Sequence, residues 1–545
     1  MLPCRMLAAA RDQELPFRQS GVGSLKVASP RGGLGAVVRE GKGSVGGPME
    51  MLLERESVLG QLGVLGQRAG RGAGRVVLLR GEAGVGKSAV IRRFIAGLDE
   101  RVRVLRGYCD PLATPRPLGP LIDMLAQLPK PEAGGLAAAI NGVGAEAIYT
   151  RLLGLFADGS SWVCAMEDVH WADGATLDLL RFLARRLGTL PVLLLVSYRD
   201  DEVGAQHPLA AALGDVATCE TLTRIGLDRL SRDAVAELAA GHAVNADELH
   251  RLTGGNPFFV TEILAAGPDT LANSALPRSV SEAVWGRLAR LSAPARDTAH
   301  AATICGPHAG ARLLEKVCPG ATAALDECLD AGVLRADGAA VAFRHELARR
   351  AALEQIPDYR RQELHARALA ALAQPPIPPE ALSALAFHAE QAGDHDAAAR
   401  YGPAAAQRAA ALGAHRQAAD LYALTLRHAD TATSQQKVVW LEEHAFASYL
   451  CGQFEDAARS WREAITLCID LGDQLGEGED LRWLSHLLWT LGRATDATAA
   501  AQASLRLLEH RGPCPQLARS LLNQALLAAA ALRTVWTHEE FSLYL

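Results

Sequence analysis

From about residue 51 the chain alternates short apolar runs with longer amphipathic stretches. The apolar runs, typical of buried strands, span 75–80, 102–105, 162–166, 192–197 and 221–227. Apolar residues recur with a helical period between them, over 87–98, 118–128, 144–156 and 174–187. Strands that alternate with helices predict an α/β domain over 49–229, built on a doubly wound parallel sheet.

After residue 230 the pattern becomes helical. Short amphipathic stretches at 231–241 and 246–252, and a third from residue 257, predict a helical lid over 230–276. The next segment, 277–373, is mostly helical with a predicted β-hairpin at 332–343, which suggests a winged-helix-like domain. The proline-rich run QPPIPPE at 374–380 is a stiff linker and a predicted boundary.

A weak repeat follows the linker. Four glycines are each followed five residues later by an alanine, in the pairs Gly393 and Ala398, Gly413 and Ala418, Gly452 and Ala457, and Gly492 and Ala497. Small residues at a tight turn let two helices approach closely, and stacked helix pairs form a solenoid. We therefore predict TPR-like helical repeats over 381–532, with an ordinary helical bundle as the alternative.

The two ends differ from the rest of the chain. Residues 1–48 are rich in glycine and show neither a helical nor a strand period, which indicates a disordered tail or a start codon assigned too early, before Met49 or Met51. Residues 533–545 are interpreted as a C-terminal end without a DNA-binding domain.

Composition narrows the class of protein. Hydrophobic residues make up 49% of the chain and charged residues 21%, as in globular proteins, and the net charge of −6 argues against a dominant nucleic-acid surface. The ten cysteines include no CxxC pair, so a reducing cytoplasm is expected. No apolar stretch approaches the roughly 20 residues of a membrane span, so no membrane association is predicted.

The strongest chemical motif directly follows the first predicted strand and opens a helix. It reads GEAGVGKS and fits the phosphate-binding loop pattern, with the residues Gly81, Glu82, Ala83, Gly84, Val85, Gly86, Lys87 and Ser88. The glycines let successive backbone N–H groups point at phosphate oxygens, and the helix dipole favours the same negative charge. Lys87 is expected to reach the β- and γ-phosphates, and the Ser88 hydroxyl to bind Mg²⁺. The motif predicts an ATP or ADP site.

Two carboxylates end the strand at 162–166. Glu167 lies where a Mg²⁺ contact is expected, and Asp168 where an acid would polarise the attacking water. One of the pair could instead serve only to cap the next helix, for which Asp173 is a natural N-cap. Arg199 follows the next strand and is predicted to sense a γ-phosphate, because ligands collect at the carboxyl ends of parallel strands. The alternative for Arg199 is a surface arginine paired with adjacent acids.

Five motifs in this order resemble one family. GEAGVGKS, MEDVHWAD (166–173), VSYRDDE (196–202), TGGNPFFV (253–260) and FRHELARRA (343–351) look like the STAND-type ATPases at the front of the large ATP-binding LuxR-family transcriptional regulators. The resemblance covers roughly residues 51–530. The P-loop alone is generic, whereas five motifs in order are specific.

The resemblance implies a signal-responsive switch. ADP would lock the resting state, an unknown inducer or protein at the helical repeats would allow exchange for ATP, and the ATP form would self-associate and hydrolyse ATP slowly. Arg199 matches the family's sensor arginine. Pro257, in Gly255-Asn256-Pro257, matches an element that packs near the adenine, and His345 matches a winged-helix histidine that contacts the ADP β-phosphate.

The sequence departs from the family in two places. Glu167 stands where aspartate is more common, which leaves the hydrolysis rate open but not binding. The family's C-terminal LuxR helix-turn-helix is not found, so DNA binding is not expected from this chain alone. A hypothesis of another class remains: a helical-repeat interaction scaffold that holds a static, structural nucleotide.

Overall fold

The computed structural model describes residues 52–111, 115–142, 145–242, 244–265, 280–338, 340–343 and 346–535. The predicted tail at 1–48 and His345 lie outside these residues. No helix within the described ranges is both long and apolar enough to cross a bilayer.

A parallel sheet forms the centre of the first domain. Its strands are β1 (Arg75–Arg80), β2 (Arg103–Tyr108), β3 (Trp162–Glu167), β4 (Val192–Tyr198) and β5 (Leu222–Gly226). They pair in the order β2-β3-β4-β1-β5, and every pairing is parallel. All five predicted strands are present, and β2 extends past its predicted end to Tyr108. Because the strands are parallel, their carboxyl ends share one edge.

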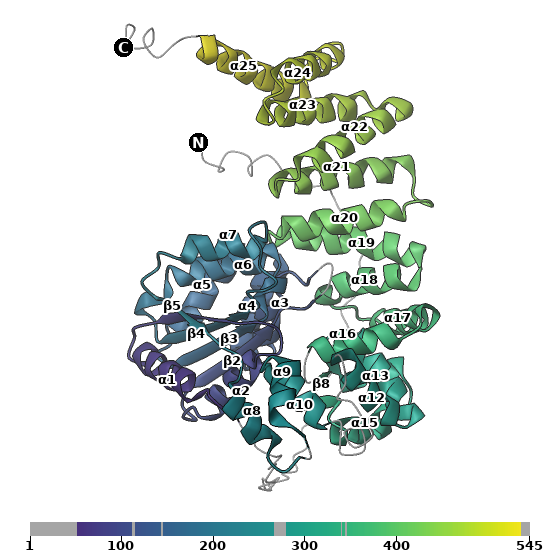
Figure 1. The fold of residues 1–545 in the computed structure, drawn as a ribbon. Helices are drawn as coiled ribbons and strands as arrows, with labels where there is room; N and C mark the ends of the chain where they lie inside the picture. The colour runs from purple at the N-terminus through teal and green to yellow at the C-terminus, as the bar shows by residue number, and fades with distance from the viewer. Residues whose placement is uncertain are drawn as a thin grey trace, which may run out of the picture. The chain divides into compact units, whose positions relative to one another are not determined.

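Helices cover both faces of this sheet (Figure 1). They are α1 (Glu56–Gly70), α2 (Lys87–Ala96), α3 (Gly119–Leu125), α4 (Lys130–Gly142), α5 (Ala145–Phe156), α6 (Gly174–Ala184) and α7 (Pro208–Val216), with short 3₁₀ turns η3 (Val169–Trp171) and η4 (Leu187–Thr189). Successive residues of β1 point to opposite faces of the sheet. Val77 and Leu79 pack with α1 and α2 on one face. Val76 and Leu78 pack with α3 to α7 on the other. The predicted doubly wound α/β fold is confirmed.

Three short helices follow the sheet, where the lid was predicted. They are α8 (Arg232–Ala239), α9 (Ala246–Thr253) and α10 (Pro257–Ala265). Leu230, Val235, Leu249 and Val260 are buried in a small core of their own. The N-terminus of α10 reaches the P-loop, as described below.

A second, antiparallel sheet belongs to the winged-helix-like segment. Its helices are α12 (Val280–Arg290), α13 (Ala293–Cys305), α14 (Ala311–Val317), α15 (Ala321–Asp330), α16 (Glu346–Gln355) and α17 (Asp358–Leu372). The strands β6 (His308–Gly310), β7 (Leu334–Asp337) and β8 (Ala340–Phe343) pair in the order β6-β8-β7. The predicted hairpin is therefore present as β7 and β8, and β6 adds a strand that the sequence pattern did not indicate.

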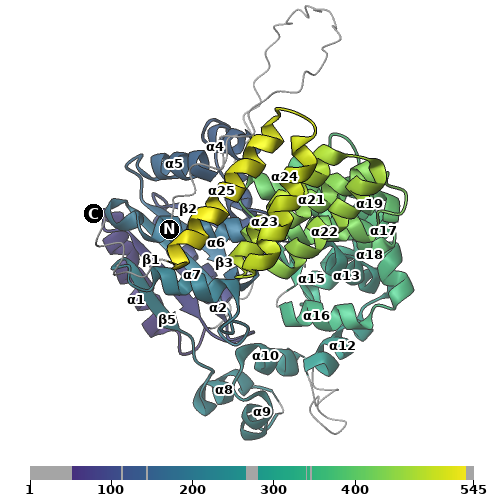
Figure 2. The same ribbon diagram turned by 90° about the horizontal axis from the view of Figure 1, so that it is seen from above.

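The chain then continues as stacked antiparallel helices (Figures 1 and 2). They are α18 (Leu382–Ala392), α19 (His395–Ala411), α20 (His415–Arg427), α21 (Ser434–Leu450), α22 (Phe454–Leu471), α23 (Gln474–Thr490), α24 (Ala494–Glu509) and α25 (Pro515–Val535), preceded by the 3₁₀ turn η5 (Pro379–Ala381). Helices α17 and α18 share a core across the proline-rich segment, in which Leu369 packs with Leu385 and Ala398. The TPR-like solenoid is confirmed.

The repeat glycines lie at turns between helices, as predicted, but for a different reason. Gly413, Gly452 and Gly492 have φ of 82°, 81° and 75°. A Cβ atom added to any of them would meet nothing within 4 Å, so close helix approach does not require glycine there. The left-handed backbone does, because it strains residues with a side chain. The close contacts are made instead by the paired alanines, which are buried at Ala398, Ala418, Ala457 and Ala497.

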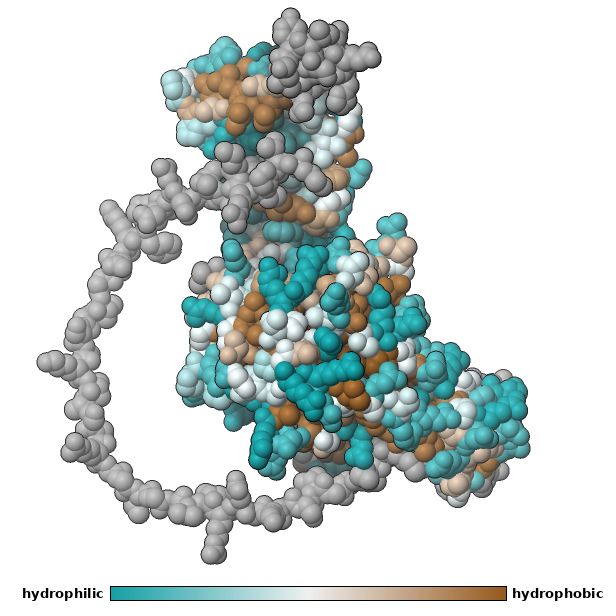
Figure 3. All heavy atoms as spheres, turned by 90° about the vertical axis from the view of Figure 1, so that its left-hand side faces the viewer, coloured by the Kyte–Doolittle hydropathy of each residue, from teal (hydrophilic) through white to brown (hydrophobic). Residues whose placement is uncertain are grey.

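Helix α25 buries two polar side chains and exposes several leucines. Ser520 and Asn523 are buried and form hydrogen bonds with serines of neighbouring helices. Leu521, Leu522 and Leu526 are 49%, 61% and 57% exposed. Figure 3 shows brown, apolar surface at this end of the repeats. The solenoid therefore presents an apolar face on α25.

Candidate functional site

The P-loop joins β1 to α2 with three glycines in unusual backbone conformations. Gly81, Gly84 and Gly86 have φ of 153°, 80° and 103°, and Gly86 is the N-cap of α2. A Cβ atom on Gly84 would lie 2.8 Å from Cβ of Phe258. The loop thus curls as expected at the start of a helix, where backbone N–H groups and the helix dipole favour an anion.

Lys87 is folded back onto this loop. Its Nζ donates to the carbonyl oxygens of Gly81 at 2.6 Å and Glu82 at 2.9 Å, and the residue is only 6% exposed. Burial lowers the pKa of Lys87, and the nearby Asp168 carboxylate opposes that shift. The ammonium group therefore lies within the loop where bound phosphates are expected.

The lid holds the P-loop from one side. Asn256, which is buried, donates from Nδ2 to Glu82 Oε1 and to the Ala83 carbonyl, both at 2.9 Å. The backbone N–H of Phe258 donates to the Gly84 carbonyl at 3.3 Å. Pro257, the first residue of α10, lies between these two contacts and is half-buried. The lid motif thus contacts the loop directly, and the role of Pro257 beside an adenine stays a prediction.

Arg55 also holds the loop and was not singled out from the sequence. It is 4% exposed, and its Nη2 donates to the carbonyl oxygens of Val85 at 3.3 Å and Asp228 at 2.7 Å. A single arginine preceding an amphipathic helix carries no signal that distinguishes it from a surface charge. Its role follows only from the tertiary structure.

The end of β3 carries the two predicted carboxylates. Glu167 is 2% exposed, and its Oε1 accepts a hydrogen bond from Arg106 Nη2 at 2.7 Å. Asp168 has left-handed backbone angles, with φ 56° and ψ 44°, and its N–H donates to Ser197 Oγ at 3.1 Å. Burial raises the pKa of Asp168 to about 6, although Arg199 and Lys87 pull it down. Both carboxylates line one cavity with Lys87.

Arg199, after β4, lines the same cavity. It is 4% exposed, its Nη1 donates to Glu202 Oε1 at 2.5 Å, and its guanidinium carbon lies 4.7 Å from the ring centroid of Trp171. Of the two interpretations of Arg199, the surface location is wrong because the side chain is buried, whereas the pairing with an adjacent acid is present. Its role as a phosphate sensor stays a prediction.

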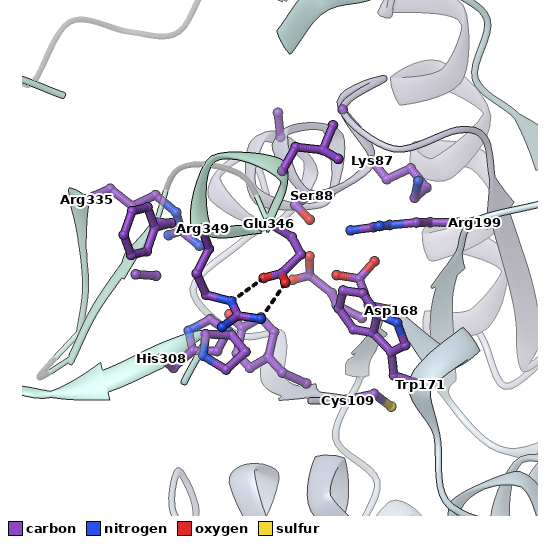
Figure 4. A pocket seen from close by; sticks show the side chains of 18 of the residues that line it. Lys87, Ser88, Cys109, Asp168, Trp171, Arg199, His308, Arg335, Glu346 and Arg349 are labelled. Carbon is purple, nitrogen blue, oxygen red and sulfur yellow. Dashed lines mark hydrogen bonds and ion pairs between the residues drawn. The ribbon is translucent and has the colours of Figure 1, made fainter. Parts of the chain in front are cut away.

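The opposite wall of the cavity comes from the winged-helix-like segment (Figure 4). Glu346 and Arg349 of α16 face Lys87, Asp168 and Arg199 across the space, and the carboxylate of Glu346 accepts two hydrogen bonds from Arg349, at 2.6 and 2.7 Å. The remaining lining residues of this wall are Pro307, His308, Arg335, Ala342, Phe343 and Leu347. His345, which the resemblance placed at this wall, lies outside the described residues.

A contact between two rings joins the two walls at the end of β2. The Tyr108 and His308 rings have centroids 4.0 Å apart, and His308 Nδ1 lies 3.0 Å from Asp337 Oδ2. Burial raises the pKa of Asp337, but the hydrogen bond from His308 and the charge of Arg335 outweigh it and hold that pKa down at about 2. This contact was not visible in the sequence because its residues are 200 positions apart in the chain.

The oxygen donors in the cavity fit a magnesium ion. Ser88 contributes a hydroxyl group and Glu167 and Asp168 contribute carboxylates to the lining of this cavity. Hard oxygen donors of this kind, together with phosphate oxygens, are the ligands that Mg²⁺ prefers. The donor set therefore agrees with the predicted cofactor.

Helix α6 connects the site to the repeats. Asp173 is its N-cap, as proposed from the sequence, and accepts hydrogen bonds from Thr176 and from the Leu118 N–H. The N–H of Gly174 donates to Gln417 Oε1 of α20 at 3.3 Å. The segment that follows Asp168 thus ends in direct contact with a repeat helix.

Comparison with known proteins identifies the first domain. Residues 51–196 match the AAA ATPase domain family. An uncharacterized protein of Rhizobium meliloti is 30% identical over 424 residues, which cover 64% of this chain and 40% of that protein. The chain thus spans less than half the length of this relative.

Two solved structures are similar at low sequence identity. One is a Signal Transduction ATPase with Numerous Domains (STAND) protein with a tetratricopeptide repeat sensor from Pyrococcus horikoshii, 14% identical, with a TM-score of 0.41 over 88% of this chain and 81% of that one. The other is a Walker-type ATPase of Pyrococcus abyssi, 14% identical, with a TM-score of 0.30 over 55% of this chain and 96% of that one. The sequence match and the P-loop geometry together show that residues 51–196 carry an AAA ATPase domain.

Proposed function

We propose that this protein is an ATP-binding signal-transduction switch of the STAND type, related to the ATP-binding LuxR-family regulators. One observation carries the proposal: a single cavity is lined by the P-loop on one wall and by the winged-helix-like segment on the other. A change of nucleotide charge there acts on both segments at once. ADP would hold the resting state, ATP the active state, and slow hydrolysis would return one to the other.

Each residue of the nucleotide site has its own role in this proposal. The P-loop backbone N–H groups and Lys87 bind the phosphates, and Pro257 packs near the adenine. Ser88 and Glu167 would hold Mg²⁺, which when bound supplies positive charge that neutralises the phosphate oxygens. Asp168 orients the attacking water and accepts its proton, while Arg199 senses the γ-phosphate. From the family resemblance, His345 would contact the β-phosphate.

The helical repeats would receive the signal. The contact between Gly174 and Gln417 supports this, because it joins the helix that follows Asp168 to a repeat helix. An inducer or protein bound to the repeats would act on the nucleotide site through α6. Self-association in the ATP form would follow from release of surfaces that the resting form holds together.

A static scaffold is the second candidate, and a different observation favours it. Ala405, Leu412 and Tyr422 of the repeat region belong to the same buried cluster as Val76 and Leu194 of the sheet. A shared core of this kind resists rearrangement. In this alternative the nucleotide would only stabilise the fold.

Nucleotide content and turnover decide between the two. The purified full-length chain is denatured, released nucleotide is identified by chromatography, and ATP hydrolysis is measured with Mg²⁺ beside Lys87→Ala. Bound ADP, slow turnover and a nucleotide-dependent change in protease sensitivity support the switch. Bound nucleotide without such a change supports the scaffold, and no affinity for ATP or ADP contradicts both.

A further inference from the structure

Glu202 lies between arginines from the two walls of the cavity. Its Oε1 accepts the 2.5 Å hydrogen bond from Arg199, and the same oxygen lies 3.8 Å from Nη1 of Arg350. Arg199 directly follows β4 of the parallel sheet, whereas Arg350 belongs to α16 of the winged-helix-like segment. One carboxylate thus neutralises the predicted phosphate sensor and links it to the opposite wall.

Trp171 positions both arginines without neutralising either. The guanidinium carbon of Arg199 lies 4.7 Å from its ring centroid and that of Arg350 lies 5.8 Å away. A cation–π contact attracts the charge but leaves its hydrogen-bond donors free for other partners. Arg199 therefore keeps a defined place beside the cavity even when its bond to Glu202 is broken.

Among the groups around Glu202, the two arginines are its main charged partners. His170 Nε2 lies 3.5 Å from Glu202 Oε2, but burial lowers the pKa of His170 to about 2, so this ring is neutral. Arg350 is shared, because its Nε lies 3.6 Å from Glu346 Oε1. Arg350 thus divides its charge between Glu346, which lines the cavity, and Glu202.

We infer that Glu202 is a positioning residue that competes with the γ-phosphate of ATP for Arg199, and that Arg350 weakens this competition from the opposite wall. The inference rests on the proposed function and specifies how the site distinguishes ADP from ATP. With ADP, Arg199 stays paired with Glu202. With ATP, the γ-phosphate must draw Arg199 from that carboxylate, so Glu202 favours the ADP state.

The affinity ratio between ATP and ADP tests this inference. Dissociation constants of fluorescent N-methylanthraniloyl ATP and ADP are measured with Mg²⁺ on the full-length chain. Glu202→Gln is expected to shift the ratio about tenfold in favour of ATP, since a charged hydrogen bond no longer competes for Arg199. Arg350→Ala should shift it the other way, because Glu202 then pairs with Arg199 alone, and Arg350→Lys should restore it.

Two controls separate this role from a structural one. Asp215→Asn removes a carboxylate that pairs with Arg181 at 2.7 Å outside the cavity, and should leave the ratio unchanged. In an Arg199→Ala background Glu202→Gln should no longer shift the ratio.

Three results would overturn the inference. In a protein that binds both nucleotides, an unchanged ratio in Glu202→Gln, or an equal shift without Arg199, overturns it and leaves the proposed function standing. Failure of the wild type to bind either nucleotide removes the proposed function and the inference together.

Discussion

The two walls of the cavity differ in how they are built. The phosphate-binding part of the AAA wall is continuous in the chain, because residues 81–88 form one loop with three glycines in left-handed backbone conformations. The winged-helix wall gathers His308, Arg335 and Glu346 from β6, β7 and α16. The loop therefore places its phosphate-binding groups within one short segment, whereas the winged-helix wall depends on how three elements pack together. Substitutions in each wall test this difference.

Removing the P-loop lysine should have the largest effect. Lys87→Ala deletes the ammonium group that now contacts the Gly81 and Glu82 carbonyls and is expected to weaken ATP and ADP binding about a hundredfold, because charged contacts to phosphate are lost. Equilibrium binding of the labelled nucleotides measures the loss. Lys316→Ala, an exposed lysine bonded to Gln374, is the matched control. An unchanged nucleotide affinity in Lys87→Ala would contradict the proposal that the P-loop wall binds the phosphates.

A methyl group on the P-loop should destabilise the AAA wall. Gly84→Ala forces a side chain into a φ of 80° and against Phe258 Cβ and Asn256 Oδ1, 2.8 and 2.9 Å from the added atom, and is expected to cost about 2 kcal/mol. Thermal unfolding reports this as a lower Tm. Gly134→Ala is the control, because its Cβ would meet nothing within 4 Å. Equal Tm values for both variants would argue against a tightly packed loop.

The buried acid gives a pH-dependent prediction. Burial raises the pKa of Asp168 to about 6, above its unfolded value near ~4, so ionisation disfavours the folded state. This cost is absent below pH 4 and complete above pH 6. Asp168→Asn is therefore expected to gain about 2 kcal/mol of stability at pH 8 and less at pH 5.

The Tm difference between Asp168→Asn and wild type at the two pH values checks this expectation. Asp178→Asn removes an exposed carboxylate that pairs with Arg181, and it serves as the control. A gain from Asp168→Asn that is the same at pH 5 and pH 8 would contradict the buried, ionising acid.

The wall formed by the winged-helix-like segment should contribute least to nucleotide affinity. Arg335 lines the cavity, and its buried Nε has no hydrogen-bond partner among the described residues. Because the side chain is partly exposed, Arg335→Ala is expected to weaken binding of both nucleotides only about threefold. Arg312→Ala, on the exposed side of α14, is the control. A loss of nucleotide affinity as large as that of Lys87→Ala would show that the two walls contribute equally to binding.

The same contrast explains what the sequence could and could not predict. The strands and the P-loop were predicted because their signals are local: apolar runs of strand length and a glycine pattern before a helix. Helix α4 was missed because Pro131, Gly134 and Gly135 lower its helix propensity, and burial of Leu136 and Ile140 against the domain outweighs that. Strand β6 has only three residues, too few to show a period.

The candidate site was predicted on one side only. Lys87, Glu167, Asp168 and Arg199 do line one cavity. Glu202 had only a general signal, as one of several acids after β4, and Arg350 looked like an ordinary helix-surface charge. Their place in the site depends on how the winged-helix-like segment packs against the AAA domain, and no local pattern encodes that.

The hydrogen bond from Asp168 N–H to Ser197 Oγ has a mechanical consequence. It fastens the end of β3 to the end of β4, two residues before Arg199. This bond adds to the pairing of β3 with β4 and ties the backbone that carries the acid to the strand end that precedes the arginine. A displacement of one strand end is therefore expected to carry the other with it, so the acid and the arginine should move together.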